Sequence, residues 1–208
     1  MFETQILLFL VTSLIIIITP GQDMILVMSR SIALGSRAGI ATATGISVGL
    51  LGHTILASLG LGAILRTSEV LFLVVKIIGA AYLIFLGIKL LKSRFEQFTL
   101  DRPTAASLRT LFFQGALSNL SNPKIAIFYF AFLPQFVPTQ STNPTPLLLT
   151  LGVSFAILTF LVKAPIGYGA GSLSHWLRTR PLIQLWINRI SGTVLVALGI
   201  RLVFEKSA

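Results

Sequence analysis

Long apolar runs separated by short polar segments form the main pattern of this chain. An apolar run of about 18 residues or more with few charges is typical of a helix that crosses a lipid bilayer. The sequence contains six runs of this kind, and turn residues and charges gather between them. The pattern therefore predicts membrane-spanning helices at about residues 5–28, 40–64, 70–91, 111–134, 147–170 and 183–204.

Composition supports an all-α integral membrane protein. Of the 208 residues, 54% are hydrophobic and 11% are charged, and the mean hydropathy is +0.90. Soluble domains carry roughly 25% charged residues, so little of this surface is expected to meet water. No segment outside the spans is long enough for a second domain, and the start, "MFETQILLFLV", lacks the basic region of a secretory signal. We therefore expect a single membrane domain over residues 1–208 with a retained first span.

The charged residues are distributed unevenly between the loops. Lys and Arg number 16 against six Asp and Glu, which gives a net charge of +10. The loops at 29–39, 92–110 and 171–182 are basic, whereas the loop at 135–146 has no charge. Short basic loops between spans orient a membrane protein with Lys and Arg in the cytoplasm, and they do not form a nucleic-acid surface. The prediction is a cytoplasmic loop at 92–110, both termini on the periplasmic side, and no nucleic-acid partner.

The two halves of the chain share short segments. "LGIKLLKS" at 86–93 resembles "LGIRLVFEKS" at 198–207, and "LRTSE" at 65–69 resembles "LRTRP" at 177–181. Both pairs keep one spacing of 112 residues, from 86 to 198 and from 65 to 177. Short matches also arise by chance in Leu- and Gly-rich sequence. Three spans per half is an odd number, so two such halves must cross the membrane in opposite senses. The predicted architecture is six transmembrane helices in two inverted three-helix repeats, at about 1–100 and 108–208.

Prolines interrupt the first and the fourth predicted spans. Pro20 lies in "TPGQD" and Pro123 lies in "LSNPKIAIF", at corresponding places of the two halves. A proline inside a helix removes a backbone donor and clashes with the preceding turn. At membrane depth the freed carbonyls need partners from protein or from a water-filled cavity. Because paired breaks of this kind indicate the substrate site of a transporter, we expect functional breaks in helices 1 and 4.

Each break also carries an ionisable side chain, Asp23 after the first proline and Lys124 after the second. Asn119 and Asn122 add amide groups beside the second break. Ionisable residues inside a membrane usually face the interior of the bundle and mark a substrate or ion path. The alternative is structural, with two kinked helices in which Asp23 and Lys124 neutralise each other. The two interpretations are compatible, because a substrate could open an existing pair.

The two breaks belong to longer stretches with a recognisable order. These are "TPGQDMILVMSRSIALGSRAGIATATGISVG", "KIIGAAYLIFLGIKLLKS" and "LSNLSNPKIAIFYFAFLPQF". Together they resemble the LysE/RhtB family of amino-acid exporters, which includes lysine, homoserine/threonine and leucine efflux proteins. The likeness covers nearly the whole chain. The resemblance implies a bacterial inner-membrane protein of six spans that exports amino acids or close derivatives, with the proton gradient as the driving force.

The motifs of that family map onto both breaks. Its first motif, usually Pro-Gly-Pro followed by Asn or Asp, falls on residues 20–23, where Gln22 replaces the second proline. Its second motif, Asn-Pro-Lys, falls on residues 122–124 without departure. The departure at Gln22 implies that the first helix unwinds less than in relatives. The predicted substrate-binding residues are Pro20, Gly21, Gln22, Asp23, Asn119, Asn122, Pro123 and Lys124.

An amino acid is zwitterionic, so both of its charged ends need partners inside a membrane. A carboxylate suits the ammonium, and a cation or a helix N-terminus suits the carboxylate. We therefore expect Asp23 to bind the α-ammonium. Lys124, with backbone N–H groups at the break, is expected to bind the α-carboxylate.

Export coupled to protons needs a side chain that gains and loses a proton. The candidates are Asp23, His53 near the middle of the second span, and Lys163 in the fifth span. Histidine titrates nearest neutral pH, and a buried lysine loses its charge readily. The alternative for His53 is a neutral, hydrogen-bonded residue of the bundle, and the alternative for Lys163 is a side chain that snorkels to the membrane surface.

Glycines are spaced along one side of the second span. Gly45, Gly49 and Gly52 lie three or four residues apart in a predicted helix. Because small residues let membrane helices approach closely, we expect this side to pack against another span.

Other classes of function find less support in the residues. "GISVG" at 45–49 matches a hydrolase motif, but it lies inside a predicted helix and not at the required strand-to-helix turn, so no enzyme is expected. The chain has no cysteine, and of its six acidic residues only Asp23 lies deep in a span, so neither a metal site nor a cofactor is predicted. A metal-cation exporter and a membrane subunit without transport activity remain alternatives. A homo-oligomer is compatible with the sequence.

Overall fold

The described part of the protein is entirely helical. The computed structural model describes residues 2–67, 69–93, 106–137, 143–170 and 181–204. Within those ranges there are helices and no strand, which confirms the predicted all-α class. The helices are α1 (Phe2–Ile18), α2 (Gln22–Leu34), α3 (Ser36–Thr67), α4 (Glu69–Leu91), α5 (Leu108–Leu120), α6 (Pro123–Phe132), the 3-10 turn η1 (Leu133–Phe136), α7 (Pro144–Tyr168) and α9 (Pro181–Phe204).

Several of these helices are long and apolar enough to cross a membrane. By length and composition, the candidates among the described residues are Ser36–Ala63, Leu73–Leu91, Pro144–Tyr168 and Leu182–Phe204. A fifth is added if α1 and α2 count as one bent span. Their positions agree with five of the six predicted spans to within about six residues, whereas the predicted span at 111–134 is not among these candidates.

Both predicted helix breaks are present. α1 ends at Ile18 and α2 begins at Gln22, and the two helices meet at an angle of 54°. α5 ends at Leu120 and α6 begins at Pro123, so two residues separate them. The two pairs are therefore broken helices, as the prolines predicted.

The prolines lie at the helix boundaries and not inside continuous helices. Pro20 is in the linker between α1 and α2, where Gly21 is the extended N-cap of α2, with φ −151° and ψ −175°. Pro123 is the first residue of α6, a position at which the missing N–H is not needed. The side chain of Asn122 caps α6 by accepting from the backbone N–H of Lys124 at 3.0 Å. Pro20 therefore precedes a new helical segment by two residues, and Pro123 begins one.

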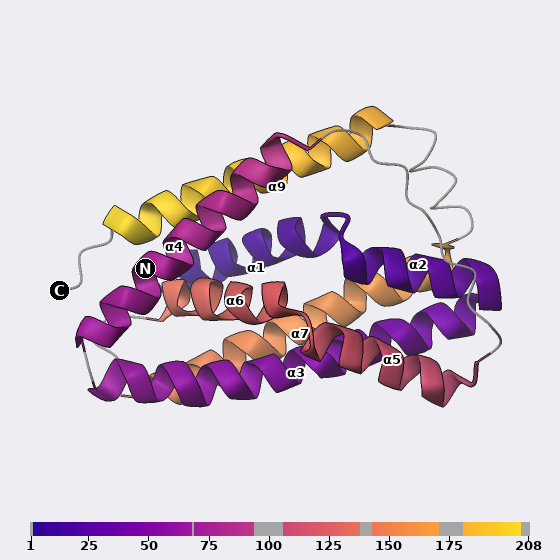
Figure 1. Ribbon diagram of the computed structural model, residues 1–208, viewed down its shortest axis with the longest axis horizontal. Coiled ribbons are helices and arrows are strands. Elements are labelled where there is room, and N and C mark those ends of the chain that lie inside the picture. Colours follow the sequence, from indigo (N-terminus) through magenta and orange to yellow (C-terminus); the bar gives the residue numbers. More distant parts are fainter. Residues whose placement is uncertain (1, 68, 94–105, 138–142, 171–180, 205–208) are drawn as a thin grey trace.

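The segments run back and forth along the long axis of the molecule. In Figure 1 the successive segments α1–α2, α3, α4, α5–α6, α7 and α9 run in alternating directions. α3 packs extensively against α7 and α5, and α4 packs extensively against α9. The result is an α2–α3–α5–α7 group next to an α4–α9 pair, and α1 and α6 contact both.

Glycines set the closest helix contacts. A Cβ atom on Gly45 would lie 2.0 Å from the carbonyl oxygen of Phe112, and one on Gly49 would lie 2.7 Å from that of Ala116. The backbones of α3 and α5 are therefore in direct contact along this side, which confirms the predicted packing role. Glycine contacts of the same kind join α4 to α9, where a Cβ on Gly87 would lie 2.7 Å from the carbonyl oxygen of Gly192.

A cluster of aromatic rings forms much of the core. Its centre is Phe132 of α6, which is fully buried and stacks on Phe128 with ring centroids 4.9 Å apart. Phe132 also contacts Phe9 of α1 at 5.8 Å and Phe155 of α7 at 6.0 Å. These contacts hold the C-terminal half of α6 between α1 and α7.

Candidate functional site

The two helix breaks lie against each other. Nδ2 of Asn119, at the end of α5, donates to Oδ2 of Asp23, at the start of α2, in a buried hydrogen bond of 2.9 Å. Nδ2 of Asn122 donates to Oε1 of Gln22 in a longer bond of 3.5 Å. Residues about 100 positions apart in the chain therefore meet at one place, and four of the predicted binding residues are brought together.

α3 supplies a third side chain to this place. His53 contacts the carbonyl oxygen of Asn119 through Nε2 at 3.0 Å. Because a carbonyl only accepts, Nε2 must carry the hydrogen, which leaves Nδ1 as the acceptor of the neutral ring. Gly49 makes this contact possible, since a Cβ there would lie 3.1 Å from Oδ1 of Asn119. His53, Asn119 and Asp23 thus form one continuous buried set of hydrogen bonds.

Lys163 of α7 lies one turn before Gly167, which packs against Val27 of α2, one turn after Asp23. Its side chain is 6% exposed. A snorkelling lysine would present its amine to the exterior, whereas this side chain is enclosed. All three proton-coupling candidates are therefore buried residues at or near the joined breaks.

Lys124 is placed differently. Its side chain is exposed at the start of α6, and its backbone carbonyl accepts from the hydroxyl of Tyr82 of α4 at 3.2 Å. Among the described residues Asp23 bonds to Asn119, and no ion pair joins it to Lys124. The pair that would neutralise both breaks is therefore not formed in this structure, and both charges are available to other partners.

Two oxygen atoms at the joined breaks have no hydrogen-bond donor. They are Oδ1 of Asp23 and Oδ1 of Asn119, which flank the hydrogen bond between the two side chains. Asp23 is 9% exposed and Asn119 is fully buried. Leaving a buried acceptor unsatisfied is unfavourable, and more so for a charged group. An ammonium group, with three N–H donors and no acceptor, suits a pair of oxygens of this kind.

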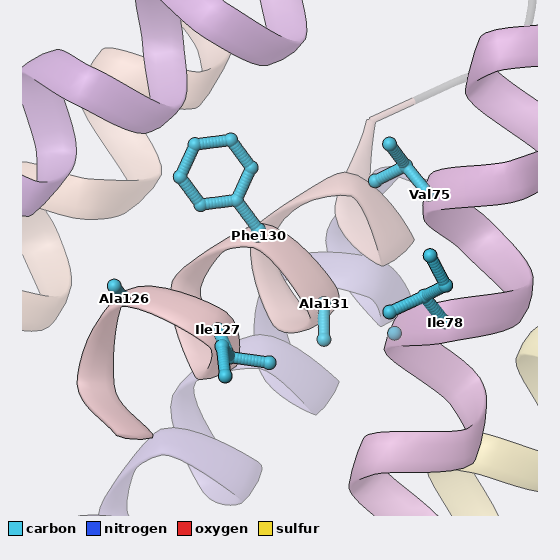
Figure 2. Close-up of a pocket in the computed structure, with 7 residues that line it drawn as sticks. Val75, Ile78, Ala126, Ile127, Phe130 and Ala131 are labelled. Carbon is cyan, nitrogen blue, oxygen red and sulfur yellow. The ribbon is translucent and has the colours of Figure 1, made fainter. Parts of the chain in front are cut away.

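An apolar crevice lies beside the second break. It has a volume of about 260 Å³ between α4 and α6, and Figure 2 shows Val75 and Ile78 extending from α4 toward α6. Its wall includes Ala126, two residues after Lys124, and Phe130. All of its lining residues are apolar, so the charged ends of a ligand would not bind there.

The comparison with protein families decides which group this chain belongs to. The model of the LysE type translocator family matches residues 14–206. The chain belongs to the LysE family. Its all-helical fold, its apolar spans and its two broken helices are thus features of a LysE family translocator.

Several relatives of this LysE family protein align along nearly their whole length. An uncharacterized membrane protein of Bacillus subtilis, YrhP, is 31% identical over 207 residues, covering 95% of this chain and 97% of the relative. A homoserine/homoserine lactone efflux protein of Salmonella typhimurium is 30% identical over 203 residues, covering 96% of each. A leucine efflux protein of Enterobacter is 27% identical over 195 residues, covering 93% and 92%. No solved structure matches the chain.

Sequence analysis missed a polar side of α9. Gln184 and Asn188 are 4% and 7% exposed, and each has a carbonyl oxygen without a hydrogen-bond partner. Nδ2 of Asn188 donates to the hydroxyl of Ser93 at 2.9 Å, and Ser191 shares a hydrogen bond with Thr19, next to the first break. The i, i+4, i+7 spacing of these three α9 residues in an apolar helix was the available signal.

Tyr129 of α6 is a second residue that the sequence did not single out. Its ring lies 5.9 Å from that of His53, and its hydroxyl is buried. It connects the His53 side of the site to the aromatic core. No group of three His, Asp or Glu side chains in the described ranges is placed to hold a metal ion.

Proposed function

We propose that this LysE family protein is a secondary transporter that exports amino acids or close derivatives from the cytoplasm. The observation that carries the proposal is the pair of unsatisfied buried oxygens where two broken helices meet. Broken helices facing each other are the usual form of a transporter's substrate site. Relatives whose names give a cargo include efflux proteins for leucine and for homoserine or its lactone.

The binding mode follows from the positions of the charges. The α-ammonium of the cargo donates to Oδ1 of Asp23 and to Oδ1 of Asn119. The α-carboxylate binds Nζ of Lys124, because Asn122 already occupies the backbone N–H of Lys124. The long bond from Asn122 to Gln22 is weak enough to open, and it then frees an amide donor for the same carboxylate.

Two inverted repeats of three helices, six spans in all, are part of the proposal. A shift of 112 residues exchanges Gly87 with Gly199 and Ala80 with Gly192. The Gly87–Gly192 contact has its counterpart in a Gly199–Ala80 contact, where a Cβ on Gly199 would lie 2.9 Å from the carbonyl oxygen of Ala80. These two contacts support the proposed repeat, because they are related by the same shift of 112 residues as the sequence matches.

Proton coupling through the buried set at the breaks completes the mechanism. His53 is linked to Asp23 through Asn119, and Lys163 is buried in α7, which packs against α2. A proton on Asp23 and a cargo ammonium compete for the same oxygens. Binding of one therefore promotes release of the other, which is the requirement for antiport in a bacterial inner membrane.

Transport by the purified protein tests this function. Liposomes that contain the protein and a mixture of labelled amino acids should release a subset of them. Asp23→Asn and Lys124→Gln should each slow this release by about 100-fold or more, because each leaves one charged end of the cargo unpaired. Lys89→Gln, which changes an exposed lysine in the last turn of α4, is the matched control.

Two outcomes would count against the proposal. Full activity in either site variant contradicts the assigned binding mode. Release of no amino acid by the wild type, in a preparation shown to be folded, contradicts export and favours a membrane subunit without transport activity.

A further inference from the structure

The two sides of the first break are held by different helices. On the α2 side, Asn119 at the end of α5 donates to Asp23. On the α1 side, the hydroxyl of Thr19 shares a hydrogen bond with the hydroxyl of Ser191 of α9. Between them Gly21 is exposed, and a Cβ there would meet only the carbonyl oxygen of Thr19, at 3.9 Å. Packing at Gly21 therefore does not fix the end of α1 relative to Asp23, and the contacts on either side have to do so.

Ser191 acts on the carbonyl end of α1. The backbone N–H of Thr19 donates to the carbonyls of Ile15 and Ile16 at 3.2 Å, and its hydroxyl donates to Ile15 at 2.8 Å. Because the hydroxyl hydrogen of Thr19 is used in this way, Ser191 is the donor in the bond between the two hydroxyls. Pro20 has no N–H to continue the helix, so the last turn of α1 presents its carbonyls at the break. These carbonyls form the negative end of the helix dipole, which favours a cation.

The neighbour of Ser191 in the chain fixes its level along the bundle. Ser191 is 1% exposed and precedes Gly192, where α9 crosses α4. A Cβ on Gly192 would lie 2.7 Å from the carbonyl oxygen of Gly87. Backbones in direct contact leave α9 little freedom to shift along α4, so the hydroxyl of Ser191 is kept at the level of the break.

α4 makes a corresponding contact with the second break. The hydroxyl of Tyr82 donates to the carbonyl oxygen of Lys124, in the first turn of α6, at 3.2 Å. Three residues earlier in α4, Gly79 packs on α6, and a Cβ there would lie 3.0 Å from Cα of Ala131. The third predicted span of each half thus contacts the break in the other half. The crossing of α4 and α9 connects the two contacts.

We propose that Ser191 and Tyr82 are positioning residues for the substrate site. Through Thr19, Ser191 holds the carbonyl end of α1 at the first break, where it adds to Asp23 in binding the ammonium of the cargo. Tyr82 holds the first turn of α6, which carries Lys124 for the carboxylate. The proposal rests on the proposed function, since it takes Asp23 and Lys124 as the sites for the two charged ends. It adds the helix pair that sets the distance between those sites.

Removal of single hydroxyl groups tests these roles. The purified full-length protein is placed in liposomes, and exchange of labelled for unlabelled compound is measured for homoserine and for each standard amino acid. For the compound that wild type exchanges best, Ser191→Ala, Thr19→Val and Tyr82→Phe should each raise the half-saturating concentration about fivefold or more. The maximal rate per folded molecule should change by less than about twofold, because the three hydroxyls do not touch the cargo.

Matched variants separate the hydrogen bond from general packing. Thr19→Ser keeps the hydroxyl and should retain the wild-type half-saturating concentration. Thr193→Ala removes an exposed hydroxyl of α9 that donates to Arg189 within the same helix, and it should have no effect. The double variant of Thr19→Val and Ser191→Ala should lose no more than either single variant, because both substitutions remove the same bond.

The possible results distinguish this inference from the proposed function. An unchanged half-saturating concentration in Ser191→Ala or Tyr82→Phe excludes that residue as a positioning residue, even if the variant unfolds at a lower temperature, and the exporter function stands. If the losses of Thr19→Val and Ser191→Ala add in the double variant, the bond between these residues is not the cause. If the wild type exchanges none of the compounds, the exporter function itself is wrong, and this inference with it.

Discussion

At the scale of single residues, the site contains buried hydrogen-bond acceptors that lack donors. Asp23 uses one oxygen to bind Asn119, and the other oxygen has no partner. An acceptor without a donor costs several kcal/mol in hydrocarbon. A ligand that supplies the donors therefore stabilises the protein at the same time as it binds, which couples affinity to folding at this residue.

His53 allows a sharp test of proton coupling. Its Nε2–H donates to Asn119, and a glutamine at this position can still donate but cannot carry a proton at neutral pH. His53→Gln should therefore retain exchange of labelled for unlabelled cargo and lose export driven by a pH gradient by about 100-fold. Both rates are measured in the same liposome preparation.

A structural role for His53 makes a different prediction. If the ring only supplies a hydrogen bond, His53→Gln keeps both rates and His53→Phe lowers both, because only the phenylalanine variant leaves the Asn119 carbonyl without its donor. Gradient-driven export by His53→Gln at the wild-type rate would exclude it from the proton path.

At the scale of elements, the sequence predicted where the helices break but not how. The prolines indicated breaks near residues 20 and 123 because proline cannot donate within a helix. The boundaries depend on their neighbours, since Gly21 takes an extended conformation and Asn122 caps α6. The roles of Gly21 and Asn122 at the helix ends can be recognised in the sequence only after the break has been located.

The contact between α3 and α5 positions the site, and it can be tested through one glycine. Gly49→Val places a branched side chain against Ala116 and Asn119, which should destabilise the protein by about 1–3 kcal/mol and separate His53 from Asn119. Thermal unfolding in detergent and transport in liposomes should both fall. Gly60→Ala is the matched control on the same helix, because its Cβ would meet only Phe130, at 3.5 Å.

Two results would contradict the prediction for Gly49→Val. If Gly49→Val unfolds at the wild-type temperature, the α3–α5 contact is looser than described. If stability falls while transport per folded molecule is unchanged, the contact does not position the site.

At the scale of the whole molecule, the sequence could not predict which helices pack against each other. Periodicity shows which side of a helix is polar, but it does not show which helix that side meets. The bond from Asp23 to Asn119 and the burial of Lys163 both depend on how distant segments pack. The polar side of α9 was missed for a related reason, because Gln184 and Asn188 lie in a run that is apolar on average.

The proposed topology can be tested directly because the chain has no cysteine. Single cysteines at Lys92, at the end of α4, and at Asn143, before α7, lie at exposed positions on segments predicted to face opposite sides of the membrane. The distribution of basic loops predicts that only Asn143→Cys reacts with a membrane-impermeant maleimide in cells whose outer membrane has been opened. Lys92→Cys should react after the inner membrane is disrupted. The reverse pattern would mean that the chain is inserted the other way round.

The bond between Asp23 and Asn119 has a consequence for how the chain is made. The two residues are 96 positions apart, and at about 5–20 residues per second Asn119 is synthesised roughly 5–20 s after Asp23. During that interval the carboxylate enters the membrane without its partner, at a cost of about 2.5–3.5 kcal/mol. The run of leucines and isoleucines in α1, just before the break, offsets this cost. The apolar character of α1 therefore serves the biogenesis of the site as well as the finished fold.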